Sequence, residues 1–534
     1  MRTAYARRVL TPVRADALDD VTLAALRTRL AELGYTVDGV TALLGDRAYA
    51  ALQRNETVPG LLATAAGGPL AGLVRLWLLQ RPVGIEEVRA ALAEGYDALL
   101  AAGVLAETGE ASAPGTMVVA LVDLRPYADD GPDGGRDLWV LSDLTPGLDG
   151  RPTRLTSDHV LGISPASTSL VQQTVREPVR RALDLGTGCG VQALHLAQHA
   201  DEVVATDVTP RALTLAALTA RLNGVTVDVR DGGFFGPVRG ERFDLIVTNP
   251  PFVISPPTEE DRLLVYRDSG VPGDGAVERI VREAAAYLTP GGWCQVLANW
   301  EIRADEPWDE RLDGWLADTG LAAWVVQREV LDPAQYVELW LKDSGDHPTT
   351  GGDVTSYEER AASWLAWLDE RGVVGIGFGW LNLRRPGPGE PTPRRLEQWH
   401  HDVEQPVGPE VAAWWRRESW LAQTDDATLL ATVLTRPVDV VQETHGEPGA
   451  ADPETIVLRQ QRGMRRARTA DTVLAGLAGA ADGELSVGAI LGALAHLLDR
   501  DAAELVGEYL PQVRDLVAER YLDPPGAATL TLRG

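Results

Sequence analysis

Two short segments of this chain combine residue types whose spacing suits a chemical role. The first is Asp184-Leu-Gly-Thr-Gly-Cys-Gly190, and the second is Asn249-Pro-Pro-Phe252. Glycines allow a sharp turn and let a ligand approach the main chain without a Cβ in the way. Prolines fix φ and remove backbone donors, so the second segment presents carbonyl oxygens and the Asn249 side-chain oxygen in a rigid frame. Such acceptors suit a planar NH2 group, aimed at an electrophile.

The glycine segment alone has low specificity. Dinucleotide enzymes use a similar turn with G-x-G-x-x-G spacing, whereas Gly186, Gly188 and Gly190 follow G-x-G-x-G. A tight turn without any ligand would also contain glycines. The apolar run ending at Leu185 and the helical pattern over Val191 to Gln198 nevertheless predict a strand, a glycine turn and a helix.

Two acids follow the next two predicted strands. Asp207 lies roughly 20 residues after the first glycine, a spacing at which a carboxylate meets ribose hydroxyls in doubly wound folds. It would also serve as the N-cap of the helical run from Pro210 to Asn223. Asp231 ends the third strand and is placed to accept from an adenine amino group, or to act as a turn residue before Gly232 and Gly233.

A fourth apolar strand, Phe243 to Thr248, leads directly into Asn249. In isolation, a Pro-Pro turn that ends a strand would explain the motif. That interpretation weakens when three strands with the other expected features precede it. Phe252 is then placed to stack on the flat group that bears the reacting nitrogen.

With these residues, the chain resembles class I S-adenosylmethionine-dependent methyltransferases, in particular the amino-methylating group marked by (Asn/Asp)-Pro-Pro-(Phe/Tyr). The resemblance covers about residues 155–345 and implies an α/β, Rossmann-like, seven-stranded doubly wound sheet. It implies cofactor-binding roles for Asp184, Gly186, Gly188, Gly190, Asp207 and Asp231, and catalytic roles for Asn249, Pro250, Pro251 and Phe252. It also implies an antiparallel hairpin formed by residues 323–330 and 336–341.

The methyl acceptor stays open between two main classes. Segments at Asp158 to Leu170 and Asp268 to Gly275 resemble, by position, parts of protein glutamine methyltransferases. Phe252 departs from their usual Tyr and is closer to rRNA guanine-N2 and adenine-N6 methyltransferases. We expect an exocyclic amine of a nucleobase in RNA first, with a glutamine amide or a small molecule as alternatives. A non-enzymatic alternative is a scaffold that binds the cofactor without turnover.

Composition restricts the remaining possibilities. The 534 residues suggest three domains, and 45% hydrophobic content provides for sizeable cores. No apolar run reaches the roughly 20 residues that span a bilayer, so we expect a cytoplasmic protein. Cys189 and Cys294 fall within predicted sheet or cofactor elements, which favours reduced core residues. No Cys and His spacing indicates a metal site. Abundant Arg beside the lone Lys342 suggests a bacterial source of actinobacterial type.

A formal net charge of −28 argues against a chain that coats itself with nucleic acid. Two groups of arginines could still contact RNA phosphates. The alternative is that they lie on solvated faces or pair with the many acids of the chain. They are Arg384, Arg385, Arg394 and Arg395, and then Arg459, Arg462, Arg465, Arg466 and Arg468.

The chain outside residues 155–345 divides by pattern. Residues 1–115 read as a helical accessory domain with a winged-helix order of elements, although a helical cap would show the same periodicity. Residues 116–154 read as a β connector. A turn-rich linker after Lys342 precedes a Trp-rich α+β accessory domain over residues 346–534, in which Trp364 and Trp367 are expected to pack in a core.

Overall fold

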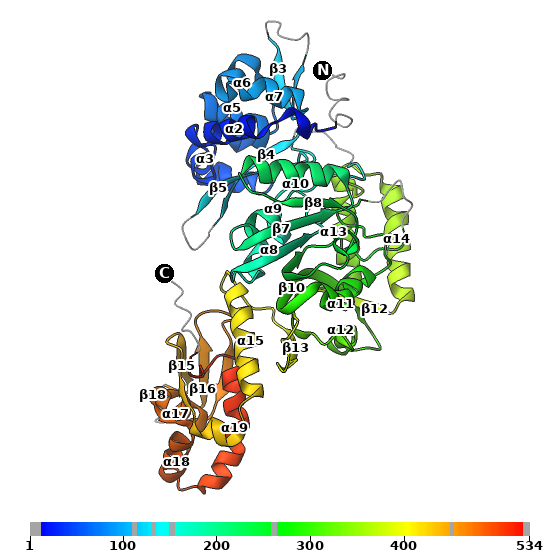
Figure 1. Ribbon diagram of the computed structural model, residues 1–534. Helices are drawn as coiled ribbons and strands as arrows, with labels where there is room; N and C mark the ends of the chain where they lie inside the picture. Colours follow the sequence, from blue (N-terminus) through cyan, green and yellow to red (C-terminus); the bar gives the residue numbers. More distant parts are fainter. Residues whose placement is uncertain are drawn as a thin grey trace. The chain divides into compact units, whose positions relative to one another are not determined.

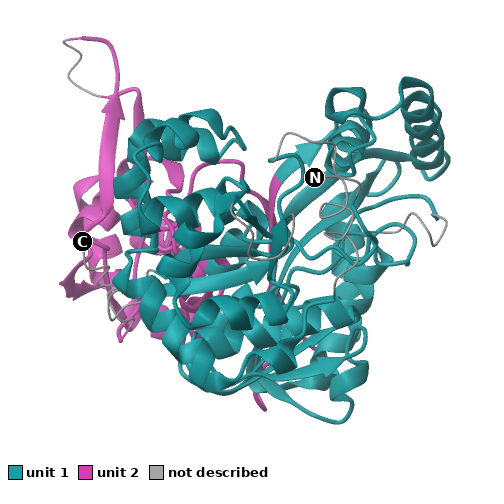
Figure 2. Cartoon of the chain, turned by 90° about the horizontal axis from the view of Figure 1, so that it is seen from above, with its two compact units in different colours: residues 1–171, 178–319, 329–381 teal, residues 172–177, 320–328, 382–534 magenta. Residues whose placement is uncertain are grey.

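The computed structural model describes residues 12–108, 115–129, 135–148, 155–257, 264–448 and 453–526. These form two compact units (Figure 2). The first unit comprises residues 1–171, 178–319 and 329–381, and the second comprises residues 172–177, 320–328 and 382–534. The segment 346–381, which the sequence assigned to the C-terminal domain, thus belongs to the first unit, while the four-part division of the chain stays a prediction.

The N-terminal part of the first unit is mainly helical (Figure 1). Its elements are η1 (Ala15–Ala17), α2 (Asp20–Glu32), α3 (Val37–Leu52), α4 (Val58–Ala63), α5 (Pro69–Leu73), η2 (Val74–Leu78), β1 (Val83–Gly84), α6 (Ile85–Leu92), α7 (Gly95–Ala101), β2 (Leu105–Thr108) and β3 (Met117–Ala120). Helix α2 begins where the Asp19 side chain accepts from the Thr22 amide at 2.8 Å. Strand β3 pairs antiparallel with both β1 and β2. The order of helices and strands follows the sequence pattern, and its winged-helix assignment remains a prediction.

A β-hairpin joins this part to the rest of the first unit. Strands β4 (Asp123–Asp129) and β5 (Arg136–Ser142) pair antiparallel, next to helix α10 (Pro210–Leu222). The Asn223 side chain accepts from the Trp139 amide at 3.0 Å and donates to the Trp139 carbonyl at 2.7 Å. One hydrophobic core contains buried residues of the N-terminal helices, of the hairpin and of α10. The N-terminal part is therefore packed into the first unit.

The first unit contains a doubly wound sheet. Its strands are β6 (Val179–Leu185), β7 (Ala200–Asp207), β8 (Asp228–Asp231), β9 (Phe243–Thr248), β10 (Leu288–Arg303) and β12 (Val373–Arg384), in the order β12-β10-β9-β6-β7-β8. Within the run β10-β9-β6-β7-β8, each pair of neighbouring strands is parallel. The intervening elements are α8 (Pro165–Gln173), α9 (Val191–Leu196), α10, η3 (Gly236–Val238), α11 (Gly275–Tyr287) and α12 (Trp308–Leu316). The strand order reverses between β6 and β9, where doubly wound folds bind ligands.

One predicted element is wrong. Residues 336–341 are not the second strand of a hairpin, because they lie in helix α13 (Pro333–Asp343). The Asp332 carboxylate accepts from the amides of Ala334 and Gln335 at 2.8 and 3.0 Å, and Pro333 suits the first helical position. Apolar residues at 336, 337, 340 and 341 follow a helical period, which the strand interpretation overlooked. The short helix η5 (Pro348–Thr350) and helix α14 (Val354–Glu370) follow, before β12.

The second unit has its own core. Strand β13 (Arg394–Gln398) pairs in parallel with residues 323–327 of β11 (Ala322–Leu331). The remaining elements are α15 (Gly408–Ala422), α16 (Asp426–Ala431), β14 (Val433–Thr435), β15 (Val440–His445), β16 (Thr455–Gln460), β17 (Ala467–Ala470), α17 (Thr472–Ala480), β18 (Asp482–Ser486), α18 (Val487–Leu497) and α19 (Ala502–Ala518). Strands β15, β16 and β17 form an antiparallel meander, and the helices enclose a hydrophobic core.

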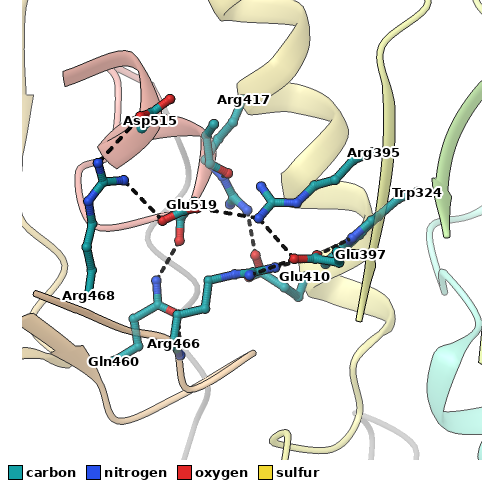
Figure 3. Close-up of polar contacts among 11 residues, drawn as sticks. Trp324, Arg395, Glu397, Glu410, Arg417, Gln460, Arg466, Arg468, Asp515 and Glu519 are labelled. Carbon is teal, nitrogen blue, oxygen red and sulfur yellow. Dashed lines mark hydrogen bonds and ion pairs between the residues drawn. The ribbon is translucent and has the colours of Figure 1, made fainter. Parts of the chain in front are cut away.

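Arginines of the second unit bind carboxylates of the same unit (Figure 3). The buried Arg466 donates two hydrogen bonds to Glu397, at 2.8 and 2.6 Å. Arg468 pairs with both Asp515 and Glu519 at 3.4 Å. Further ion pairs are Arg384 with Glu390, Arg395 with Glu397, Arg459 with Glu443, and Arg462 with Glu404. These contacts match the alternative in which the arginines balance the many acids.

The Asn223 contact gives a stability prediction. Asn223→Ala should lower the free energy of unfolding of the first unit by about 1–3 kcal/mol, because the backbone amide and carbonyl of the buried Trp139 lose their side-chain partner. Urea unfolding curves measure this change. Gln53→Ala, at an exposed position, is the control and should change stability by less than about 0.5 kcal/mol. Equal effects of the two substitutions would contradict a specific role for Asn223.

Candidate active site

The glycine turn joins β6 to α9. Gly186, Gly188 and Gly190 have left-handed φ values of 78°, 56° and 88°. A Cβ on Gly186 or Gly188 would meet no heavy atom within 4 Å, whereas one on Gly190 would meet the Ala216 backbone at 3.2 Å. The first two glycines thus border open space, and the third allows the close approach of α10.

Asp184 supports this turn from inside the protein. Its carboxylate accepts from the Thr187 hydroxyl and from the Ala193 amide, the latter at 3.1 Å. The side chain is fully buried, and this desolvation raises the pKa of Asp184 to about 7. Asp184 is not among the residues that line the cavity described below. The geometry therefore favours an indirect role, in which Asp184 shapes the turn that would hold the ligand.

Asp207 supports the same turn from the other side. Its carboxylate accepts from the Gly188 amide at 3.0 Å and from the Thr209 amide at 2.9 Å. Desolvation raises the pKa of this carboxyl as well. Unlike Asp184, it lines the cavity. The N-cap of α10 is Thr209, so the N-cap role expected for Asp207 is wrong, although its carboxylate accepts from the Thr209 amide. Its contact with ribose stays a prediction.

Asp231 ends β8 opposite Asp207 but is exposed and does not line the cavity. The next three residues, Gly232, Gly233 and Phe234, line it instead. Phe234 has a left-handed φ of 49°, and the Arg279 guanidinium lies 4.1 Å from its ring centroid. Sequence reasoning missed this residue. The signal was the aromatic side chain after two glycines at the end of the third strand.

The second motif begins at the end of β9. The Thr248 hydroxyl donates to the Leu185 carbonyl at 2.7 Å, which ties this strand end to the start of the glycine turn. Asn249, Pro250 and Pro251 line the cavity. The Asn249 Oδ1 atom is buried and, within the described residues, has no hydrogen-bond partner. Phe252 does not line the cavity; its ring meets Trp340 edge-on, with a centroid distance of 6.2 Å.

Both motifs thus open on one cavity of about 410 Å³. The lining also includes His159 and Ser269, which lie in the two segments noted in the sequence at 158–170 and 268–275, and Tyr266, which the sequence did not single out. Burial lowers the pKa of the His159 imidazole. The Tyr266 hydroxyl donates to Asp343 of α13. None of the described lining residues is Lys or Arg.

The lining suits a cofactor that is part nucleoside. The main chain beside Gly186 and Gly188 is open to a ligand, Asp207 offers a carboxylate to hydroxyl groups, and Val208 and Phe234 provide apolar walls for a flat base. In the described part of the chain, no group of three or more His, Cys, Asp or Glu residues is placed to hold a metal ion. Cys189 and Cys294 are free and buried, as predicted.

Comparisons with known proteins agree with this geometry. The methyltransferase small domain family matches residues 161–314, and a domain of unknown function (DUF7059) matches residues 32–115. The chain is 34% identical over 194 residues to the release factor glutamine methyltransferase of Deinococcus radiodurans, covering 32% of this chain and 69% of that protein. Identity to the enzyme of the same name from Geobacter sulfurreducens is 37% over 138 residues, covering 23% of this chain and 48% of that protein.

The chain is also 34% identical over 122 residues to the ribosomal RNA small subunit methyltransferase C of Alcanivorax borkumensis, covering 23% of this chain and 33% of that protein. It spans about half the length of several curated relatives that it matches. The fold and the arrangement of the site are those of the class I methyltransferases. The chain belongs to the methyltransferase small domain family, and its cofactor class is S-adenosylmethionine. The predictions of the family and of the doubly wound α/β fold are confirmed.

In the described residues, no helix is long and apolar enough to cross a membrane.

Asp184 gives a prediction for pH dependence. Its pKa rises from 3.8 to about 7 on folding, so the folded state holds this proton more tightly than the unfolded state. The stabilisation that this proton provides is therefore lost as pH rises from about 4 to about 7. Over that range, the contribution of Asp184 to the free energy of unfolding falls by up to about 4 kcal/mol. Asp184→Asn keeps an acceptor oxygen but cannot ionise, and should lose this contribution. Urea unfolding at pH 5 and pH 7.5 measures the difference. Identical pH profiles for the two proteins would contradict the assignment.

Proposed function

We propose that this chain transfers a methyl group from S-adenosylmethionine to a planar NH2 nitrogen. The observation that supports this most is the buried Oδ1 of Asn249, which lines the same cavity as the glycine turn and has no partner among the described residues. Buried polar atoms are nearly always hydrogen-bonded, and a donor from an acceptor substrate would satisfy this one.

The cofactor would occupy the part of the cavity between β6 and β8. The main chain at Gly186 and Gly188 would hold its methionine part, and Asp207 would bind the ribose hydroxyls. Phe234 and Val208 would enclose the adenine ring. Asp184 and Gly190 would shape this site from behind, and Asp231 would lie at its edge. S-adenosylmethionine supplies an activated methyl group on a sulfonium.

The chain's own residues would orient the acceptor nitrogen. The Asn249 Oδ1 and the Pro250 carbonyl would accept its two N–H groups, which draws electron density onto the nitrogen and aims its lone pair at the methyl carbon. The N–C bond forms as the S–C bond breaks, and the bonding pair returns to sulfur. The extra proton on nitrogen leaves to water. This mechanism rests on proximity and orientation and requires no strong base.

The lining of the cavity favours an uncharged amide, such as a protein glutamine, as the methyl acceptor. No described lining residue is cationic, and arginines considered for RNA phosphates bind carboxylates of the second unit. An exocyclic amine of an RNA base, the first expectation from the sequence, stays the second candidate. The identity to a ribosomal RNA methyltransferase and the Phe252 variant of the motif support it.

Substitution of Asn249 tests the catalytic proposal. Asn249→Ala should reduce methyl transfer by about 100-fold or more, because the acceptor nitrogen loses a hydrogen bond that orients it. Binding of S-adenosylhomocysteine, measured by calorimetry, should change by less than about threefold, since Asn249 would contact the acceptor. Asn249→Asp keeps an acceptor oxygen and should retain more activity than Asn249→Ala. Normal transfer by Asn249→Ala would contradict the proposed mechanism.

Fractionation of the methylated product tests the acceptor class. Purified protein is incubated with radiolabelled S-adenosylmethionine and a cell extract, and the product is divided between RNase and protease treatment. We expect the macromolecular label to be lost on protease treatment and to survive RNase. Loss only to RNase would establish the RNA alternative. Label on small molecules alone, or no label, would overturn the glutamine proposal.

A further inference from the structure

A pair of helices stands where the second strand of a β-hairpin was expected, and it shares a hydrophobic core with the end of the Asn249-Pro-Pro-Phe252 loop. Helices α13 and α14 lie between β11 and β12. Their core includes Tyr336 and Trp364, and it also contains Val253 and Ile254, the two residues that follow the loop. The loop exit is therefore packed against these helices.

Both polar backbone groups of Ile254 are held by side chains from this helix pair. The Ile254 amide donates to the Tyr336 hydroxyl at 2.8 Å. The Trp364 indole donates to the Ile254 carbonyl at 3.0 Å. The Tyr336 hydroxyl also accepts from the Asn299 side chain of β10 at 2.9 Å, which ties the helix to the sheet. Tyr336, Ile254 and Asn299 are fully buried, so water cannot replace these partners.

The two residues before Ile254 have contacts to the same region. The Phe252 ring meets Trp340 of α13 edge-on. The Val253 amide donates to the Arg267 carbonyl at 3.0 Å, and the Arg267 guanidinium donates to the Trp340 carbonyl at 2.7 Å. Three consecutive residues after Pro251 are thus fixed, directly or through Arg267, by α13 and α14.

We infer that the helix pair of residues 333–370 sets the position of the acceptor-binding loop, with Tyr336 and Trp364 as positioning residues. This inference rests on the proposed function. Strand β9 fixes the loop before Asn249, through the Thr248 hydroxyl, and the clamp on Ile254 fixes it after Phe252. Because two prolines stiffen the segment between these anchors, a shift at Ile254 moves the acceptor atoms at Asn249 and Pro250. Misplacement by about 1 Å can reduce a positioned reaction by about 100-fold.

Two conservative substitutions test this inference. Tyr336→Phe removes only the hydroxyl, and Trp364→Phe removes the indole donor. Each should lower kcat for methyl transfer by about tenfold or more. The KM for S-adenosylmethionine and the affinity for S-adenosylhomocysteine should stay within about twofold, because neither residue lines the cavity. Rates are measured with radiolabelled S-adenosylmethionine and the cell-extract fraction that the wild-type protein methylates.

Tyr35→Phe is the matched control. Tyr35 is equally buried and donates to the Leu124 carbonyl at 2.7 Å, in the N-terminal part of the first unit. It should lose stability without a change in kcat. Hydrogen exchange adds a readout at the loop: Tyr336→Phe should speed exchange in a peptide covering residues 250–257 and leave a peptide covering residues 184–196 unchanged.

The outcomes separate the inference from the function on which it rests. A wild-type protein that transfers no methyl group would overturn both. Wild-type transfer with unchanged kcat in Tyr336→Phe and Trp364→Phe would overturn the positioning role alone. A fall in kcat that Tyr35→Phe reproduces at equal loss of stability would also overturn it, because the effect would then be general.

Discussion

The parallel pairing of β6 with β9 is the constraint on which the site depends. Leu185 and Thr248 are partners in this register and are 63 residues apart in the chain. Because parallel strands end at the same edge of a sheet, the glycine turn after Leu185 and the loop after Thr248 emerge side by side. The Thr248 hydroxyl bond to the Leu185 carbonyl holds the two strand ends together. Under the proposed function, a cofactor at the glycine turn would therefore lie adjacent to an acceptor at the Asn249 loop.

Two carboxylates hold the glycine turn, and they do so at an electrostatic cost. Asp184 and Asp207 each accept from backbone amides of the turn or of the helix that follows it, and desolvation raises the pKa of both. Hydrogen bonds offset part of this cost. A cationic sulfonium cofactor would favour the ionised form of nearby carboxylates, so cofactor binding and the ionisation of these acids should be linked.

The sequence predicted the parts of the site whose signals are local. Glycines with the required φ values, the strand ends and the Pro-Pro pair lie in short segments, and periodicity identified the strands around them. Phe234 was missed because its role depends on a left-handed turn that brings its ring to the cavity. Helix α13 was mistaken for a strand because Val337, Leu339 and Leu341 alternate with polar or aromatic residues. The N-cap at Asp332 stabilises the helix instead. The pairing of Arg466 with Glu397 joins residues far apart in the chain, which no local pattern shows.

Helix α10 shows how the N-terminal part belongs to the unit that carries the cavity. On one side its Ala216 backbone lies close to Gly190, where a Cβ would come within 3.2 Å. At its C-terminal end Asn223 completes the hydrogen bonds of Trp139 in the β4–β5 hairpin, and Arg221 donates to the Leu18 carbonyl. Helix α10 thus contacts both the glycine turn and the N-terminal elements, and all of them share one hydrophobic core. The N-terminal part therefore shares its core with the helix that packs against the glycine turn.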